Sequence, residues 1–154
     1  YKYLVYSQKT ERPMLWKRAL RVPQKLNIPA MNEAAAHLIG EHDFSAFRAA
    51  GCQSKSPYRR VIDANWTRRG AFVIFNIKAN AFLLHMVRNI VGSFLDVGKG
   101  IKDSDWFSEL VDRGERSGAG VTAPSDGLYL VGVDYPKNHG IPKGTTLPLF
   151  FSEI

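Results

Sequence analysis

The chain has 154 residues, 45% of them hydrophobic, and a formal net charge of +7. This length and composition suit one domain with a substantial core. A single cysteine, Cys52, excludes an internal disulfide and a metal site built on thiolates, and no run of residues is apolar enough to span a bilayer.

The charge is unevenly distributed along the sequence. Lys and Arg outnumber Asp and Glu by 14 to 5 in residues 1–78, whereas Asp and Glu outnumber Lys and Arg by 9 to 7 in residues 79–154. A basic half beside a mildly acidic half predicts one surface that faces a polyanion. An inert basic surface explains the composition equally well.

Residues 1–7 alternate and are rich in tyrosine, which predicts a strand. Because the chain opens directly in this strand without a methionine, and no signal peptide is visible, we expect a piece of a longer protein. Residues 15–22 are compatible with a strand or with an extended basic loop. Asn27 is expected to cap a helix, with Pro29 in its first turn, that ends at Gly40.

A polar, basic stretch covers residues 45–60 and contains a glycine and a proline. It predicts a loop of the kind that contacts phosphates, although a solvated surface loop fits the same residues. Two alternating segments follow, residues 61–67 and 71–78, and the Arg68-Arg69-Gly70 turn between them predicts a β-hairpin.

The hairpin leads directly into residues 80–100, around which the rest of the chain is organised. Asn80 is expected to cap a helix of about five turns that is apolar nearly all round, which is typical of a central helix. One polar stripe interrupts it at spacings of three and four residues: His85, Arg88, Asn89, Gly92, Asp96 and Lys99. Arg88 either reaches water along this stripe, with its stem on apolar neighbours, or enters a cleft to hold an anion. Periodicity does not choose between the two.

In the last third of the chain, Ser104 is expected to cap a short helix that Gly114 closes, and residues 128–135 to form a strand. The tail, which ends in residues 147–154, is expected to lie across the domain. Four or five strands and three helices that do not strictly alternate predict an α+β fold, with an antiparallel β-sheet flanked by helices.

No familiar catalytic signature is present: the sequence contains no HExxH, P-loop, GxGxxG or paired-cysteine pattern. His42 and Asp43 could form an acid–base pair, but adjacent residues in a turn more often bond locally. The residues alone therefore assemble no nucleophile, base and orienting partner.

Four segments together resemble the tRNA pseudouridine synthase A family: YKY at 1–3, HDFSAF at 42–47, KANAFLLHMVRNIVGSFLDVG at 78–98 and APSDGLYLVGVDYP at 123–136. They occur in order over almost the entire chain and match the C-terminal part of the family's enzymes. The resemblance implies that residues 1–154 are the C-terminal half of the pseudouridine synthase fold. The family's N-terminal part, which carries the aspartate nucleophile in a GRTDxGVHA motif, is absent here.

The resemblance implies isomerisation of uridine to pseudouridine in the anticodon stem-loop of tRNA, at positions 38 to 40. It implies a cytoplasmic homodimer that needs no metal and no organic cofactor, in which the aspartate acts on a flipped-out nucleotide. This chain alone is expected to be inactive. Two rival interpretations stay open: a non-catalytic RNA-binding module, and a structural or dimerisation domain in which Arg88 is a surface residue.

The resemblance also assigns site residues. Arg88 matches the family arginine that pairs with the aspartate, and its guanidinium would keep that carboxylate ionised and oriented. Tyr1 matches the first tyrosine of the family's YxY strand, which packs against the target base. The weaker expectations are RNA contacts. The basic loop would supply Arg48, Lys55 and Arg59, and the cleft around the helix would be lined by Asn80 and His85. For Asn80 and His85, capping and core packing are the alternatives.

Overall fold

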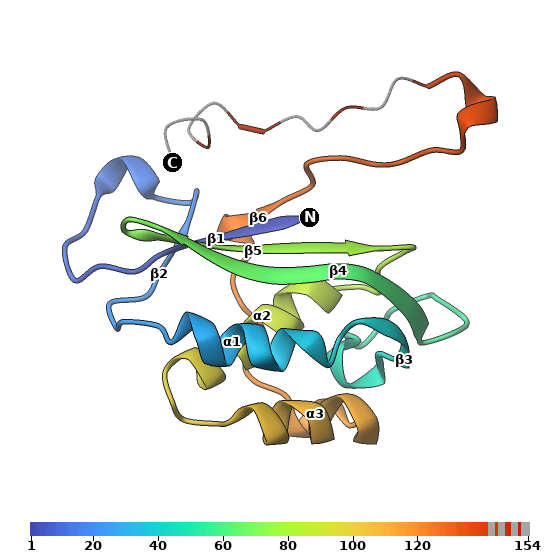
Figure 1. Ribbon diagram of the computed structural model, residues 1–154, viewed down its shortest axis with the longest axis horizontal. Coiled ribbons are helices and arrows are strands. Elements are labelled where there is room, and N and C mark those ends of the chain that lie inside the picture. Colours follow the sequence, from blue (N-terminus) through green and yellow to red (C-terminus); the bar gives the residue numbers. More distant parts are fainter. Residues whose placement is uncertain (142–143, 145–146, 149–150, 152–154) are drawn as a thin grey trace.

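The computed structural model describes residues 1–141, 144, 147–148 and 151. In this part of the chain a six-stranded sheet carries three α-helices on one face, whereas residues 130–141, which follow the last strand, run on the opposite side (Figure 1). The strands are β1 (Lys2–Tyr6), β2 (Leu20–Arg21), β3 (Gly40–Asp43), β4 (Tyr58–Arg69), β5 (Phe72–Ala79) and β6 (Leu128–Tyr129).

The sheet has the order β2-β1-β5-β4-β3, and β6 also pairs with β1. Its pairs are antiparallel except β1 with β2, a short parallel contact in which Val5 faces Leu20 and Tyr6 faces Arg21. The predicted α+β class with a largely antiparallel sheet is thus confirmed. The expected strand over residues 128–135 is shorter than predicted, because only Leu128 and Tyr129 pair with β1.

Two of the helices, α1 (Ile28–Ala36) and α3 (Ser104–Arg113), form close to where capping residues predict them. The side-chain oxygen of Asn27 accepts a hydrogen bond from the Ala30 amide at 3.2 Å, as expected of a cap. The cap of α3 is Asp103, not Ser104, since its carboxylate accepts from the Trp106 amide at 2.8 Å. Gly40 begins β3 and does not end α1.

The central helix, α2 (Met86–Gly98), begins later than predicted, and Asn80 does not cap it. The Asn80 side chain accepts from the Arg60 amide at 2.9 Å, and the Asn80 amide donates to the Arg60 carbonyl at 3.0 Å. These bonds to Arg60 of β4 therefore hold Asn80 just beyond the end of β5, and residues 81–85 carry the chain from the sheet to the helical layer. His85, in the left-handed conformation with φ 59°, is the last residue before α2.

Aromatic side chains join the sheet to the helices. Trp66 of β4 stacks on Phe75 of β5 at 4.8 Å between ring centroids, Phe75 meets Phe94 of α2 at 5.2 Å, and Phe94 stacks on Phe107 of α3 at 4.4 Å. This core holds α2 against both neighbouring layers, as its apolar circumference predicts.

The opposite face of the sheet has a smaller apolar cluster of Leu4, Ile74 and Phe151. Phe151 belongs to the tail that was expected to lie across the domain, and it is buried there. Residues 149–150 and 152–154 of that tail lie outside the described residues.

Candidate active site

Arg88 lies in the first turn of α2 and is tied to Ala123 by a pair of hydrogen bonds. Its Nε donates to the Ala123 carbonyl at 2.7 Å, and the Ala123 amide donates to the Arg88 carbonyl at 3.1 Å. The side chain is half-buried, and no ion pair among the described residues includes it. Nε of Arg88 is thus hydrogen-bonded, whereas neither Nη atom has a hydrogen-bond partner within the described part of the chain.

Tyr3, the first tyrosine of β1, lies beside the same turn of the chain. It is fully buried, and its hydroxyl donates to the Pro124 carbonyl at 2.7 Å, next to the carbonyl that holds Arg88. Burial raises the pKa of Tyr3 well above its usual value, and the nearby positive charge of Arg88 only partly opposes this. Tyr3 therefore stays neutral. The prediction favoured Tyr1 and missed Tyr3, although alternation along the strand places both on one face.

Tyr1 packs edge-on against Phe82, with ring centroids 4.9 Å apart and an interplanar angle of 87°. Both rings line a hollow of about 810 Å³ that Asn80 also lines, so two of the predicted residues come together there. Arg88 and His85 are not among its lining residues. Polar groups surround the two rings, notably Lys2, which bonds to Asn76, and Lys78, which pairs with Asp134.

The predicted basic loop is shorter than residues 45–60, because Ser45–Phe47 form a helical turn and β4 already begins at Tyr58, so that Arg59 lies in a strand. Arginines brace the remainder. Arg48 donates to the carbonyls of Cys52 at 2.8 Å and Ser54 at 2.7 Å, and Arg59 donates to the Ser54 hydroxyl at 2.6 Å. Lys55, by contrast, is exposed. The Ala49 amide donates to the Leu84 carbonyl at 3.1 Å, which places this loop beside the segment that leads into α2 and contains the exposed His85.

A stretch that we term the covering segment, residues 116–123, lies along the polar stripe of α2. Asn89 is only 1% exposed beneath it. A Cβ atom added to Gly92 would lie 1.8 Å from the Val121 carbonyl oxygen, so backbone meets backbone there. The middle of the stripe is therefore a packing surface and not an open cleft wall, and Arg88 lies at its edge.

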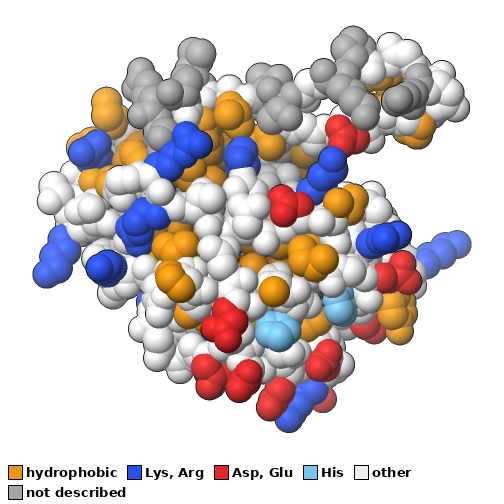
Figure 2. Space-filling view, viewed as in Figure 1, with side chains coloured by type: hydrophobic (Ala, Val, Ile, Leu, Met, Phe, Trp, Pro, Cys, Tyr) orange, Lys and Arg blue, Asp and Glu red, His pale blue; other side chains and the backbone are white. Residues whose placement is uncertain are grey.

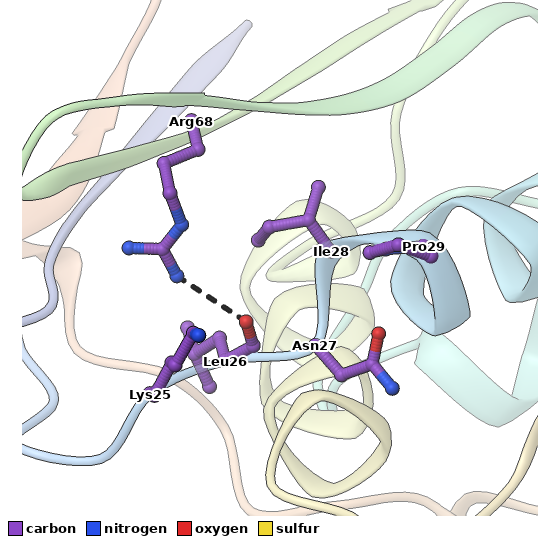
Figure 3. A pocket seen from close by; sticks show the side chains of 6 residues that line it. All are labelled: Lys25, Leu26, Asn27, Ile28, Pro29 and Arg68. Atoms are coloured by element: carbon purple, nitrogen blue, oxygen red, sulfur yellow. Dashed lines mark hydrogen bonds between the residues drawn. The ribbon is translucent and has the colours of Figure 1, made fainter.

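A separate hollow of about 530 Å³ lies at the start of α1, and Figure 3 shows its lining. Arg68 reaches from β4 and donates to the Leu26 carbonyl at 3.2 Å, close to Lys25 (Figure 3). None of the predicted site residues lines this hollow. The candidate site residues therefore lie in two places: Arg88 and Tyr3 bond to the adjacent carbonyls of Ala123 and Pro124, and Tyr1 lines the hollow that Asn80 also lines.

The charge asymmetry of the sequence is visible on the surface. In Figure 2 acidic side chains gather at the lower end, over α3, while Lys and Arg side chains are spread over the side that holds β2. Across the described residues no group of three or more His, Cys, Asp or Glu side chains is placed to hold a metal ion. In that same part of the chain, every helix is too short or too polar to cross a membrane.

Comparison with known proteins adds an independent finding. A family model described as tRNA pseudouridine synthase matches residues 34–136. Proteins named tRNA pseudouridine synthase A are 45% identical over 152 residues in Tolumonas auensis, 44% over 153 residues in Enterobacter sp. (strain 638) and 43% over 153 residues in Escherichia coli O1:K1 / APEC. Each match covers 99% of this chain but only 57% or 58% of the relative, so the chain spans less than two thirds of their length.

Proposed function

The chain belongs to the tRNA pseudouridine synthase family, and we propose that residues 1–154 form the C-terminal segment of such a synthase's catalytic domain. The proposed reaction takes place on a uridine of the anticodon stem-loop of tRNA. The bond between N1 of the base and C1′ of the ribose breaks, the base turns, and a bond forms between C5 and C1′. The C5 proton leaves and N1 takes up a proton, so the product is an isomer of the substrate. The part of the protein that this chain lacks would supply the aspartate, and the reaction needs no metal or organic cofactor.

The way Arg88 is held is the observation that supports this proposal most. Its Nε is engaged by the Ala123 carbonyl, so the guanidinium has a fixed direction, while both Nη atoms can still donate. A carboxylate accepts two parallel N–H bonds from such a fork. The adjacent positive charge would also lower the carboxylate's pKa and keep it ionised. We therefore assign to Arg88 the role of orienting the aspartate.

The aromatic hollow supports a place for the target base. Tyr1 and Phe82 present ring surfaces there, and aromatic rings stack on bases that have left a helix. We propose that Tyr1 packs against the uracil. The RNA backbone would be met by Arg48 and Lys55 of the basic loop and by Arg59 at the start of β4, with contacts from Asn80 and His85.

Reconstitution tests the reaction. We would join this chain to the portion of the Tolumonas auensis relative that it does not cover, and measure tritium release from tRNA labelled at C5 of uridine. The joined protein is expected to release tritium and the 154-residue chain alone to release none. Tight tRNA binding without release by the joined protein would favour the rival function, a non-catalytic RNA-binding module.

We further propose that the complete synthase is a cytoplasmic homodimer, in which the second copy completes the tRNA site. The joined protein is expected to sediment at the mass of two chains at micromolar concentration. A single-chain mass at that concentration, with full activity, would contradict the dimer.

Binding of tRNA by the joined protein is expected to weaken with salt, because Lys and Arg release counterions when they meet phosphates. Three phosphate contacts predict a loss of about 20-fold in affinity between roughly 50 and 200 mM salt. Lys55→Ala should make the salt slope shallower, whereas Lys102→Ala should not, because Lys102 lies over the Trp106 ring of α3. Fluorescence titrations at four salt concentrations measure this, and a flat response would remove electrostatics as the basis of binding.

A further inference from the structure

We propose that Arg116 is a positioning residue for Arg88, a role that rests on the function proposed above. Arg116 precedes the rest of the covering segment and ties that segment to α2. The same segment carries the Ala123 carbonyl that holds the inner nitrogen of Arg88. Arg116 therefore acts on the direction of the Arg88 guanidinium without taking part in the chemistry itself.

The Arg116 guanidinium makes contacts to both sides of this junction. Its Nη2 donates to the Asn89 side-chain oxygen at 3.2 Å and to the Thr122 hydroxyl oxygen at 3.0 Å, and its Nη1 donates to the Gly120 carbonyl at 3.2 Å. The Thr122 hydroxyl in turn donates to the Asn89 oxygen at 2.6 Å. The planar Arg116 guanidinium thus joins Asn89 of α2 to Gly120 and Thr122 of the covering segment. Thr122 is adjacent to Ala123.

Asn89 is the fixed end of this network. Its Nδ2 donates to the Phe47 carbonyl at 2.7 Å, which orients the amide so that its oxygen faces Arg116 and Thr122. The side chain is buried, and each of its polar atoms has a partner, so the arrangement has one satisfied orientation. Asn89 directly follows Arg88 in α2, so the network is anchored one residue from the group that it positions.

The backbone leaves little freedom between the two elements. Gly92 admits the Val121 carbonyl where a side chain would collide, and the Gly120 amide donates to the Ser93 hydroxyl at 3.0 Å. Contacts this close hold the covering segment, and with it the Ala123 carbonyl, against α2. Since a displacement of about 1 Å at a reacting group can cost about 100-fold in rate, the network matters for catalysis.

Two pairs of variants in the joined, full-length protein separate positioning from simple stabilisation. Arg116→Lys keeps the charge but loses the planar fork that reaches Asn89, Thr122 and Gly120 together. Thr122→Val removes the hydroxyl at nearly constant volume, and Thr122→Ser keeps it. Arg113→Lys is the matched control, because among the described residues Arg113 forms its ion pair with Glu109 on the exposed side of α3.

The experiment measures kcat, KM for tRNA, melting temperature and the arginine Nε–H signals in ¹⁵N–¹H spectra. The Arg88 signal is identified by its absence in Arg88→Lys. Arg116→Lys and Thr122→Val are expected to lower kcat by about tenfold or more with KM within about twofold, and to remove the solvent-exchange protection of the Arg88 Nε–H. Thr122→Ser and Arg113→Lys should keep the kcat of the unmodified protein and the protected Arg88 Nε–H signal.

The positioning role is overturned if Arg116→Lys lowers the melting temperature but keeps kcat and the protected Arg88 signal, since that is the pattern of a purely structural residue. If the unmodified joined protein shows no turnover, the proposed function fails, and the spectra still decide about Arg116. A protected Arg88 signal in Arg116→Lys then counts against positioning, and a lost one supports it.

Discussion

Replacing Arg88 by lysine in the joined synthase is expected to lower kcat/KM by about 100-fold while tRNA affinity stays nearly unchanged. Arginine can give Nε to the Ala123 carbonyl and both Nη atoms to a carboxylate at the same time. A lysine ammonium carries its three N–H donors on one nitrogen, so it cannot reach the Ala123 carbonyl and hold a carboxylate in a two-pronged geometry at the same time. A 100-fold loss corresponds to about 2.7 kcal/mol of transition-state stabilisation.

Tritium release at tRNA concentrations well below KM measures this effect, and Arg113→Lys serves as the control for a lysine substitution that touches no candidate site residue. Turnover within about threefold of the unmodified protein would leave Arg88 as a half-buried arginine with a structural bond only. Filter binding of labelled tRNA to the same variant shows whether the loss lies in chemistry or in binding.

Gly92→Ala is expected to lower the melting temperature of the chain by about 5–10 °C, from a loss of about 2–3 kcal/mol. In an unconstrained helix the same change would stabilise by about 1 kcal/mol, since alanine is the better helix former. Here the added methyl group would lie 1.8 Å from the Val121 carbonyl oxygen, so α2 and the covering segment must separate. The sign of the change therefore reports on the backbone contact.

Gly98→Ala in the same helix is the matched control. The atom nearest to its added Cβ is the Met31 sulfur at 2.6 Å, the far part of a flexible side chain that can move away. Thermal unfolding followed by circular dichroism should give Gly98→Ala a clearly higher melting temperature than Gly92→Ala. A Gly92→Ala protein as stable as the original would mean that the covering segment is not held against the helix.

Local rules predicted much of the fold. Asn27 and Gly114 act as the caps their residue types suggest, and the β4–β5 hairpin follows from alternation and its glycine turn. The predicted start of α2 was wrong because a tertiary contact competes with the local capping signal. Asn80 has the chemistry of a cap, but pairing with Arg60 across the sheet uses its amide and side chain instead. A pattern within a short stretch of sequence does not reveal that Asn80 pairs with Arg60, 20 residues away.

The candidate site was only partly predictable. Arg88 could be found from its place in a polar stripe, and the resemblance gave that stripe a meaning. Tyr3 and Arg116 were missed because their partners are remote in sequence: 121 residues separate Tyr3 from Pro124, and 27 separate Arg116 from Asn89. The available signal was the glycine content of residues 115–127, which permits a backbone to lie directly on a helix.

Strand β1 has a further consequence for handling the protein. Its edge away from β5 is occupied by two short partners from distant parts of the chain, β6 along Lys2 and Tyr3 and β2 along Val5 and Tyr6. The Tyr129 hydroxyl also donates to the Arg18 carbonyl at 2.6 Å, which pins the loop before β2. Truncation of the chain before Leu128 would remove β6 and leave this edge of β1 without a strand partner along Lys2 and Tyr3. An exposed strand edge of this kind pairs with other molecules, so we expect the truncated protein to aggregate during purification.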